Sequence, residues 1–193
     1  GATYFEVPSW FSPPPDGTSH LPLVVINTGG QYIPDEPKIN AHMIVIDNGP
    51  GMLNRIDDMP TDYNGIIAIE TRGQSSSQFP KKSYTLEARD AAGNDFKAPI
   101  LDMPEESDWI LHAPYSDKTL VRNAISFDLS RKMGDWAPRF KYCEVYIDGD
   151  YKGVYLFMEK IKRDGDRVDI QKLGPEVTSG DSLTGGYIFR VDK

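Results

Sequence analysis

The sequence predicts an α+β fold with a mostly antiparallel β-sheet and one principal helix. Several short runs of apolar or alternating residues are bounded by Gly, Pro, Asn or Asp, which is typical of strands. One pair of runs is separated by Asp148-Gly149, a dipeptide that favours tight hairpin turns. Only the stretch 117–133 has apolar residues at helical spacing over several turns. This order of elements indicates α+β architecture in one domain or one large lobe.

Five strands are expected before the helix. They are residues 21–28, 41–47, 64–73, 83–90 and 108–114. In the fourth strand Tyr84, Leu86 and Ala88 alternate with polar residues, which predicts one buried and one solvent-facing side. The polar turn between the third and fourth strands therefore connects neighbours in the sheet.

The helix is expected at 117–133. Ser116 is a suitable N-cap, Asp117 suits the positive end of the helix dipole, and Gly134 provides a residue that ends helices. A broad apolar face is expected from Leu120, Val121, Ala124, Ile125, Phe127 and Leu129. Asp128 projects near the middle of this face, where a carboxylate requires a partner. A structural salt bridge and a functional role both explain it.

Residues 140–162 predict a hairpin with Glu159 near its end. Tyr155, Phe157 and Glu159 share one face of its second strand, which suits an oriented carboxylate. The alternative is a surface carboxylate paired with basic residues; these are Lys160, Lys162 and Arg163. A last strand is expected at 185–193.

Composition excludes several classes of function. The net charge of −8 and the pI of about 4.9 argue against binding to nucleic acid or anionic membranes, and favour a basic partner. No apolar run is long enough to span a bilayer. Cys143 alternates with apolar strand residues, as a buried cysteine does, and the three histidines have no metal-ligand spacing, so no metal ligands are assigned. Residues 1–20 have the composition of a Pro-rich linker or processed terminus of an exported protein.

The turn at residues 70–84 is rich in serine and positive charge. Arg72, Lys81 and Lys82 flank it, and Gly73 frees the backbone at the end of the strand. These groups suit a phosphate or other polyanion, although their spacing matches no standard phosphate-binding loop. A solvated hairpin loop with lysines would have the same composition.

Four segments together resemble the CotH family, the spore coat protein H group of atypical protein kinases. They are RGQSSSQFPKKSY, DWILHAPYSDKTLVRNAISFDL, GVYLFMEKIKR and GGYIFRVD, and the resemblance covers about residues 21–192. It implies part of an atypical kinase-like fold and an ATP-dependent phosphotransferase that uses Mg²⁺. The phosphate acceptor would be Ser or Thr in a secreted or coat protein, with a basic, Ser-rich substrate as the expected partner.

The resemblance also implies site residues. The matching positions are Arg72, Gly73, Lys81, Lys82, Tyr84, Arg122, Asn123, Asp128, Gly153, Glu159 and Asp192. Arg72, with Lys81 or Lys82, is expected to contact nucleotide phosphates, and Glu159 to orient that lysine. Glu159 and Asp192 are the candidate catalytic carboxylates. Arg122 and Asn123 either reach the ligand or tie the helix to a loop.

The chain departs from the family pattern at its metal-binding aspartates. In that pattern these aspartates lie in downstream motifs of the type N-Y-D and W-D-x-D, and neither motif occurs in this sequence. Residues 21–193 are therefore expected to be the N-terminal, nucleotide-binding portion, which alone binds ATP and Mg²⁺ weakly and transfers no phosphate. The alternative function is a non-catalytic binding or structural module of a cell surface or spore coat. Either role places the protein outside the cytoplasm or in the coat.

Overall fold

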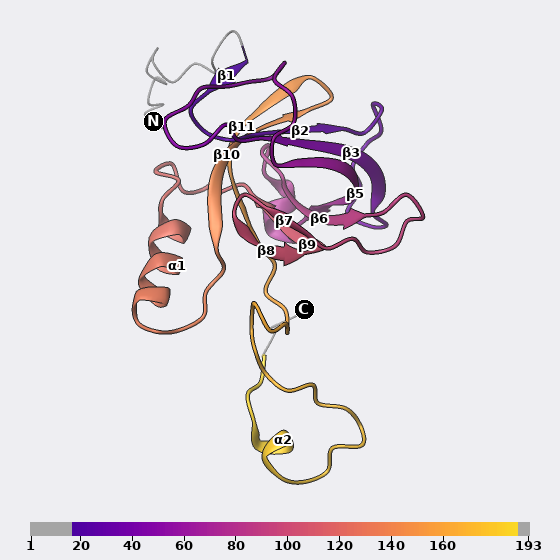
Figure 1. Cartoon of the computed structure of the whole chain (residues 1–193), viewed down its shortest axis with the longest axis vertical. Coiled ribbons are helices and arrows are strands. Elements are labelled where there is room, and N and C mark those ends of the chain that lie inside the picture. The colour runs from indigo at the N-terminus through magenta and orange to yellow at the C-terminus, as the bar shows by residue number, and fades with distance from the viewer. Residues whose placement is uncertain (1–16, 189–193) are drawn as a thin grey trace.

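A closed barrel of seven β-strands forms the centre of the computed structural model, which describes residues 17–188 (Figure 1). Among the described residues, strands make up 39% and helices 11%. The prediction of an α+β fold that resembles part of a kinase is therefore wrong, because the fold is mostly β and its sheet closes on itself. One principal helix and mostly antiparallel pairing are seen among the described residues, as predicted.

The barrel is closed by two strands that are far apart in the sequence. The order around the barrel is β10-β11-β9-β6-β5-β3-β2, and every neighbouring pair is antiparallel except β2 and β10, which are parallel. The strands are β2 (Leu23–Asn27), β3 (Ile39–Ile46), β5 (Tyr63–Arg72), β6 (Ser83–Arg89), β9 (Asp108–His112), β10 (Phe140–Ile147) and β11 (Asp150–Glu159). Closure pairs the two edges that an open sheet would expose.

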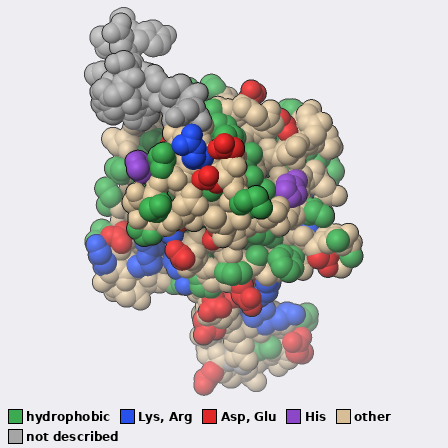
Figure 2. Space-filling view, turned by 45° about the horizontal axis from the view of Figure 1, so that its top comes forward, with side chains coloured by type: hydrophobic (Ala, Val, Ile, Leu, Met, Phe, Trp, Pro, Cys, Tyr) green, Lys and Arg blue, Asp and Glu red, His purple; other side chains and the backbone are tan. Residues whose placement is uncertain are grey.

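Smaller elements decorate the barrel. They are β1 (Thr18–Ser19), β4 (Asn54–Arg55), β7 (Ala98–Ile100), β8 (Met103–Glu106), the 3₁₀ helix η2 (Ser75–Gln78), α1 (Arg122–Lys132) and α2 (Asp181–Thr184). β1 pairs with β4, and β7 with β8. The chain after β11 projects from the barrel and carries side chains of both charges (Figures 1 and 2). Within 17–188, no helix combines the length and apolarity that a membrane crossing requires.

The core fills the inside of the barrel with alternate residues from each strand. Leu86 and Ala88 of β6 are fully buried, as the period of two predicts. The rings of Trp109 and Phe157, on β9 and β11, lie 5.4 Å apart between their centroids. Burial of such large apolar side chains is the main favourable term in folding, at roughly 25 cal/mol per Å².

The five predicted strands and the hairpin are confirmed. The hairpin turn has Asp148 and Gly149 at φ values of 50° and 84°, the left-handed conformation that favours this dipeptide. The carboxylate of Asp148 also accepts hydrogen bonds from the backbone N–H and hydroxyl of Thr28, at 2.7 and 2.6 Å. The turn residue therefore fastens the hairpin to the end of β2, beside the closure of the barrel.

The helix begins later than predicted. α1 starts at Arg122 because Leu120 has a φ of 60°, outside the helical region. The expected N-cap Ser116 lies before this break. Instead, the carboxylate of Asp117 accepts a hydrogen bond from the backbone N–H of Arg122 at 2.8 Å. The segment 117–121 is a turn that leads into the helix.

The predicted apolar face of α1 is mostly exposed. Only Ala124 is buried within the helix, while Ile125 and Leu129 are 60% and 56% exposed. α1 stands beside the barrel, and Phe127 packs on Phe140 of β10 with ring centroids 6.1 Å apart (Figure 1). Asp128 therefore does not interrupt a buried face.

The last predicted strand is not seen. Residues 185–188 form no strand, and residues 189–193 lie outside the described part of the chain.

Candidate functional site

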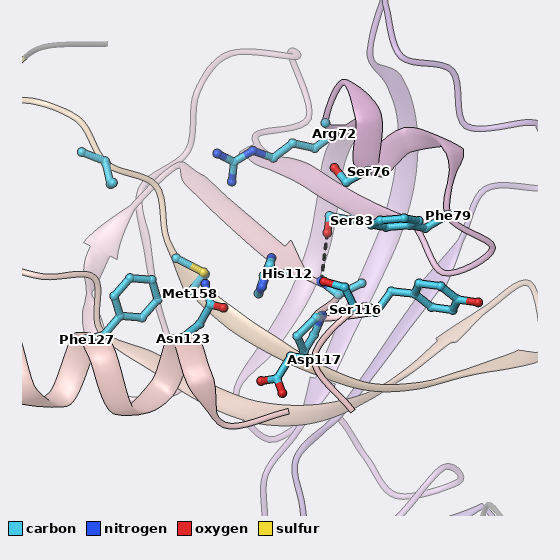
Figure 3. Close-up of a pocket in the computed structure, with 15 residues that line it drawn as sticks. Arg72, Ser76, Phe79, Ser83, His112, Ser116, Asp117, Asn123, Phe127 and Met158 are labelled. Carbon is cyan, nitrogen blue, oxygen red and sulfur yellow. Dashed lines mark hydrogen bonds between the residues drawn. The ribbon is translucent and has the colours of Figure 1, made fainter. Parts of the chain in front are cut away.

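A cleft lies at one end of the barrel, where three strands end near one another (Figure 3). β5 ends at Arg72, β6 begins at Ser83 after the η2 turn, and β9 ends at His112. The cleft has a volume of about 430 Å³. Its lining, which defines the Arg72 cleft, is Arg72, Gly73, Ser76, Phe79, Ser83, His112, Ala113, Pro114, Tyr115, Ser116, Asp117, Asn123, Phe127, Met158 and Ile161.

The strand-to-turn corner depends on Gly73. Its φ is +113°, and a Cβ atom built there would lie 2.0 Å from the hydroxyl oxygen of Ser76. Any residue type with a Cβ atom would be strained at this φ and would also clash with the Ser76 hydroxyl, so only glycine fits this position. Gly73 therefore allows η2 to fold against the end of β5, beside the side chain of Arg72.

His112 lies inside the cleft, with Arg72 above it in the view of Figure 3 and Asn123 beside it. Its Nε2 atom is buried and has no hydrogen-bond partner among residues 17–188. Burial lowers the pKa of His112, the positive charge of Arg72 lowers it further, and the side chain of Asn123 opposes both. The neutral imidazole is therefore favoured near pH 7, leaving Arg72 as the cation beside it.

The pKa of His112 predicts how stability depends on pH. Because the folded state holds this pKa below the ordinary value of about 6.5, the unfolded state binds more protons between the two values. The contribution of His112 to the free energy of unfolding is therefore complete above about pH 6.5, and it is lost as the pH falls through the folded-state pKa. We expect His112→Gln to flatten the fall in unfolding free energy between about pH 7 and 5, measured by urea denaturation. The exposed His20→Gln is the control, and an unchanged slope in His112→Gln would contradict the assignment.

Asp117 positions the start of α1 beside the cleft. Its carboxylate accepts hydrogen bonds from the Thr119 hydroxyl at 2.6 Å and the Arg122 backbone N–H at 2.8 Å. These bonds lower the pKa of Asp117, the Thr119 hydroxyl most. The Arg122 guanidinium lies 3.6 Å from the same carboxylate and is largely exposed, whereas Asn123 lines the cleft. Arg122 and Asn123 were expected either to reach the ligand or to tie the helix to a loop. Arg122 ties the helix to the loop, whereas Asn123 faces the cleft.

A second, wider cavity adjoins the Arg72 cleft. We call it the Glu70 cavity; it measures about 720 Å³ and shares Arg72, Gly73, Met158 and Ile161 with the cleft. Its other lining residues are Asp35, Glu36, Glu70, Thr71, Thr85, Ile110, Lys160 and Ile188. Burial raises the pKa of Glu70, Lys38 and Lys160 oppose this, and Glu36 and Asp35 reinforce it. The cleft thus opens from a basic side chain toward an acidic neighbourhood.

Lys81 and Lys82 do not join Arg72 in one cradle. The Lys81 ammonium donates a hydrogen bond to the Val154 carbonyl at 2.5 Å and lies 4.5 Å from the centre of the Tyr155 ring. It lines a different cavity, on the other side of the Pro114–Asp117 loop. The Lys82 ammonium donates to the Ser77 carbonyl at 2.5 Å and holds the η2 turn.

Glu159 is fully buried, in a network different from the one expected. Its carboxylate accepts hydrogen bonds from the Arg139 guanidinium at 2.7 Å and the Arg139 backbone N–H at 2.8 Å. The guanidinium of Arg167 lies 3.8 Å from it. The expected pairing with Lys81 or Lys82 is not formed, and the alternative of a surface carboxylate is wrong. Glu159 and Asp128 were each predicted to pair with a basic group, and this is confirmed. Glu159 pairs with Arg139, and Asp128 pairs with Lys132 at 2.7 Å on the helix surface.

A family model supports the resemblance seen in the sequence. The model described as CotH kinase protein matches residues 69–193, which is more than half of the chain and includes every lining residue of the Arg72 cleft. The chain belongs to the CotH family. It is also similar to the inner spore coat protein H of Bacillus subtilis (strain 168), with 30% identity over 95 residues. That alignment covers 49% of this CotH chain and 24% of the relative, so the chain spans about a quarter of the relative's length.

Two parts of the predicted CotH site are not tested by the fold. Asp192, a candidate catalytic carboxylate, lies outside the described residues. Among residues 17–188, no three His, Cys, Asp or Glu side chains gather in a way that could hold a metal ion. The catalytic roles of Glu159 and Asp192 remain predictions.

In this CotH chain, the structure places residues in the cleft and in the Glu70 cavity that were not site candidates from the sequence. His112 was assigned only to a strand, and Glu70 to the strand before the turn. A signal for His112 exists in hindsight, because it ends β9 as Arg72 ends β5, and β6 pairs with both of these strands. Asp35 and Glu36 carry no such signal, since a loop outside the barrel strands brings them to the Glu70 cavity.

Proposed function

We propose that the Arg72 cleft binds the phosphates of ATP, and that this chain is the nucleotide-binding portion of a CotH-type protein kinase. The observation that supports it best is the position of Arg72 at the strand-to-turn corner, in a cleft that also presents Ser76 and Asn123. A guanidinium and neutral hydrogen-bond donors suit phosphate oxygens. Phosphoryl transfer depends mainly on positioning and on neutralising phosphate charge.

The rest of the cleft suits the other end of a nucleotide. Phe79 and Tyr115 contact each other with ring centroids 5.1 Å apart, and Phe127 and Met158 provide further apolar surface. Flat apolar faces beside a few polar groups are typical of small-molecule sites. We assign the base to these side chains and the phosphates to Arg72. Magnesium, when bound, would neutralise phosphate charge.

The acceptor belongs to the same proposal. The net charge of −8 and the acidic lining of the Glu70 cavity favour a basic, Ser-rich protein substrate, and the relative's name places that protein in the inner spore coat. We propose a coat or extracytoplasmic location for this chain as well. Because the chain spans about a quarter of that relative, phosphorylation is proposed for the whole protein, and binding alone for these 193 residues.

A non-catalytic coat or surface module is the second candidate. It is favoured by the exposed row of Val121, Ile125, Leu129 and Met133 along α1, which has the spacing of a helix–helix contact. Binding of ATP at the cleft would distinguish the kinase reading from this one.

Arg72→Gln tests the kinase reading. Hydrogen bonds to charged groups contribute about 1.5–3 kcal/mol, so we expect ATP affinity, measured by calorimetry, to fall about tenfold or more. The matched control is Arg55→Gln, which removes a surface arginine that is paired with Asp57 at 3.7 Å. Wild-type protein should gain about 2.7 kcal/mol of stability at an ATP concentration 100 times the Kd. Equal ATP affinity in the two variants would contradict the phosphate role of Arg72, and absence of ATP binding in wild type would favour the coat module.

A further inference from the structure

A small, mostly apolar cavity lies on the far side of the Pro114–Asp117 loop from the Arg72 cleft. It measures about 260 Å³, and we call it the Lys81 cavity. Its walls are Lys81, Pro114, Tyr115, Asp117, Lys118, Leu120, Tyr151, Gly153 and Val154. It shares only the loop residues with the Arg72 cleft, so it is a neighbouring and separate space.

The side chain of Lys81 lines this cavity. It donates one hydrogen bond to the Val154 carbonyl and lies over the ring of Tyr155. A lysine has three N–H donors, and the hydrogen bond to Val154 uses one of them. Within residues 17–188 it has no carboxylate within 4.0 Å, and burial lowers its pKa. A partly buried cation without a counter-ion favours an anion that arrives from outside.

The one acid in the cavity lining does not supply that counter-ion. Asp117 lines the same cavity, but its carboxylate is engaged by the Thr119 hydroxyl and by the backbone N–H of Arg122. A second ammonium, that of Lys118, lies 4.2 Å from the centre of the Tyr115 ring, at the cavity wall. The charged side chains in the lining therefore give the cavity a net positive charge, and its other walls are aromatic or aliphatic.

Gly153 makes room for this arrangement. Its φ is +92°, and a Cβ atom there would lie 3.2 Å from the Lys81 ammonium nitrogen. A side chain at this position would press on the lysine from the β11 side and would strain the backbone. The glycine thus leaves room for the Lys81 ammonium against β11.

We propose that the Lys81 cavity binds a small monocarboxylate with an apolar body, separately from the nucleotide site. The carboxylate would accept a hydrogen bond from the Lys81 ammonium, and the apolar body would pack between Tyr115, Leu120 and Tyr151. A phosphate group suits this site less than a monocarboxylate does, because the lining is mainly apolar and the space is small.

The test uses benzoate as the probe and benzamide as its neutral isostere. We expect benzoate to bind the 193-residue chain, measured by calorimetry and by NMR shifts of the residues around Leu120 and Tyr151. Benzamide should bind at least about tenfold more weakly, because it lacks the charge that Lys81 pairs with. This comparison uses unaltered protein, so it does not depend on the folding of a variant.

Variants then locate the site. Lys81→Met should weaken benzoate binding by about tenfold or more. The control Lys152→Met removes an equal charge from β11, close to the cavity but outside its lining, where Lys152 pairs with Asp150 at 3.4 Å, and it should leave binding unchanged. Equal binding of benzoate and benzamide, no benzoate binding, or full binding by Lys81→Met would each overturn the proposal.

Competition with ATP separates this proposal from the proposed kinase function. If both hold, ATP affinity is unchanged in Lys81→Met and benzoate affinity is unchanged in Arg72→Gln. Displacement of benzoate by ATP, with loss of ATP binding in Lys81→Met, would show that the cavity belongs to the nucleotide site and would overturn a separate carboxylate site. Benzoate binding without any ATP binding would support this site and reject the nucleotide assignment.

Discussion

Glu159→Gln is expected to lower the unfolding free energy by about 3–5 kcal/mol, the cost of removing one partner of a buried ion pair. Glu159 is fully buried, and it accepts hydrogen bonds from the guanidinium and the backbone of Arg139. The side chain of Arg167 is almost fully buried beside it and would lose its neighbouring carboxylate. Urea denaturation with a linear extrapolation measures the change.

Asp128→Asn is the matched control for this substitution. It also removes a paired carboxylate, but Asp128 is exposed and pairs with Lys132 on the helix surface, where such pairs contribute little. We expect its denaturation midpoint to stay at the wild-type value. Equal loss of stability in both variants would contradict the prediction that the buried ion pairs of Glu159 stabilise the fold more than the surface pair of Asp128 does.

Gly73→Ala is expected to damage both the stability and the ligand binding of the Arg72 cleft. A non-glycine residue at positive φ costs about 1–3 kcal/mol. In addition, the new Cβ would meet the Ser76 hydroxyl oxygen at 2.0 Å, so the Ser76 side chain must rotate or η2 must shift from the end of β5. Since Arg72 precedes this glycine, we expect ATP affinity to fall about tenfold or more, on the same scale as loss of a charged hydrogen bond. Denaturation and calorimetry measure the two effects.

Gly93→Ala separates backbone strain from the clash. Gly93 has a φ of +85° with nothing within 4 Å of a built Cβ, so it carries strain alone and lies outside the cleft. Its ATP affinity should match wild type. Adding Ser76→Ala to Gly73→Ala removes the clashing oxygen and should restore part of the lost stability. A double variant no more stable than Gly73→Ala would show that the clash with Ser76 does not explain the effect.

Local elements of this fold could be predicted because neighbouring residues decide them. The alternation in β6 and the Asp148-Gly149 turn are visible in a few residues. Closure of the barrel could not be predicted, because it depends on pairing β2 with β10, which no local pattern records. The helix was placed too early for a similar reason: the positive φ of Leu120 is accompanied by a hydrogen bond from the Tyr142 hydroxyl to its carbonyl at 2.8 Å.

The site was predicted in part. Arg72, Gly73 and Asn123 lie together in one cleft, as the turn chemistry and the family resemblance suggested. Lys81 was grouped with Arg72 because the two flank one turn, but the side chain of Lys81 reaches across β11. Spacing along a turn does not fix which side of it a long side chain follows. The partners of Glu159 were missed because Arg139 and Arg167 approach it from other segments.

The closed barrel also affects where this protein can be cut. The family match begins at Ile69, in the middle of β5, and leaves out β2 and β3. A fragment that starts there would break the circle of hydrogen bonds and expose the strand edge of β10 that β2 normally covers. Such an edge recruits strands from other molecules. The segment that the family model matches is therefore smaller than the unit that folds, and expression boundaries are better placed before β2 than at the first matched residue.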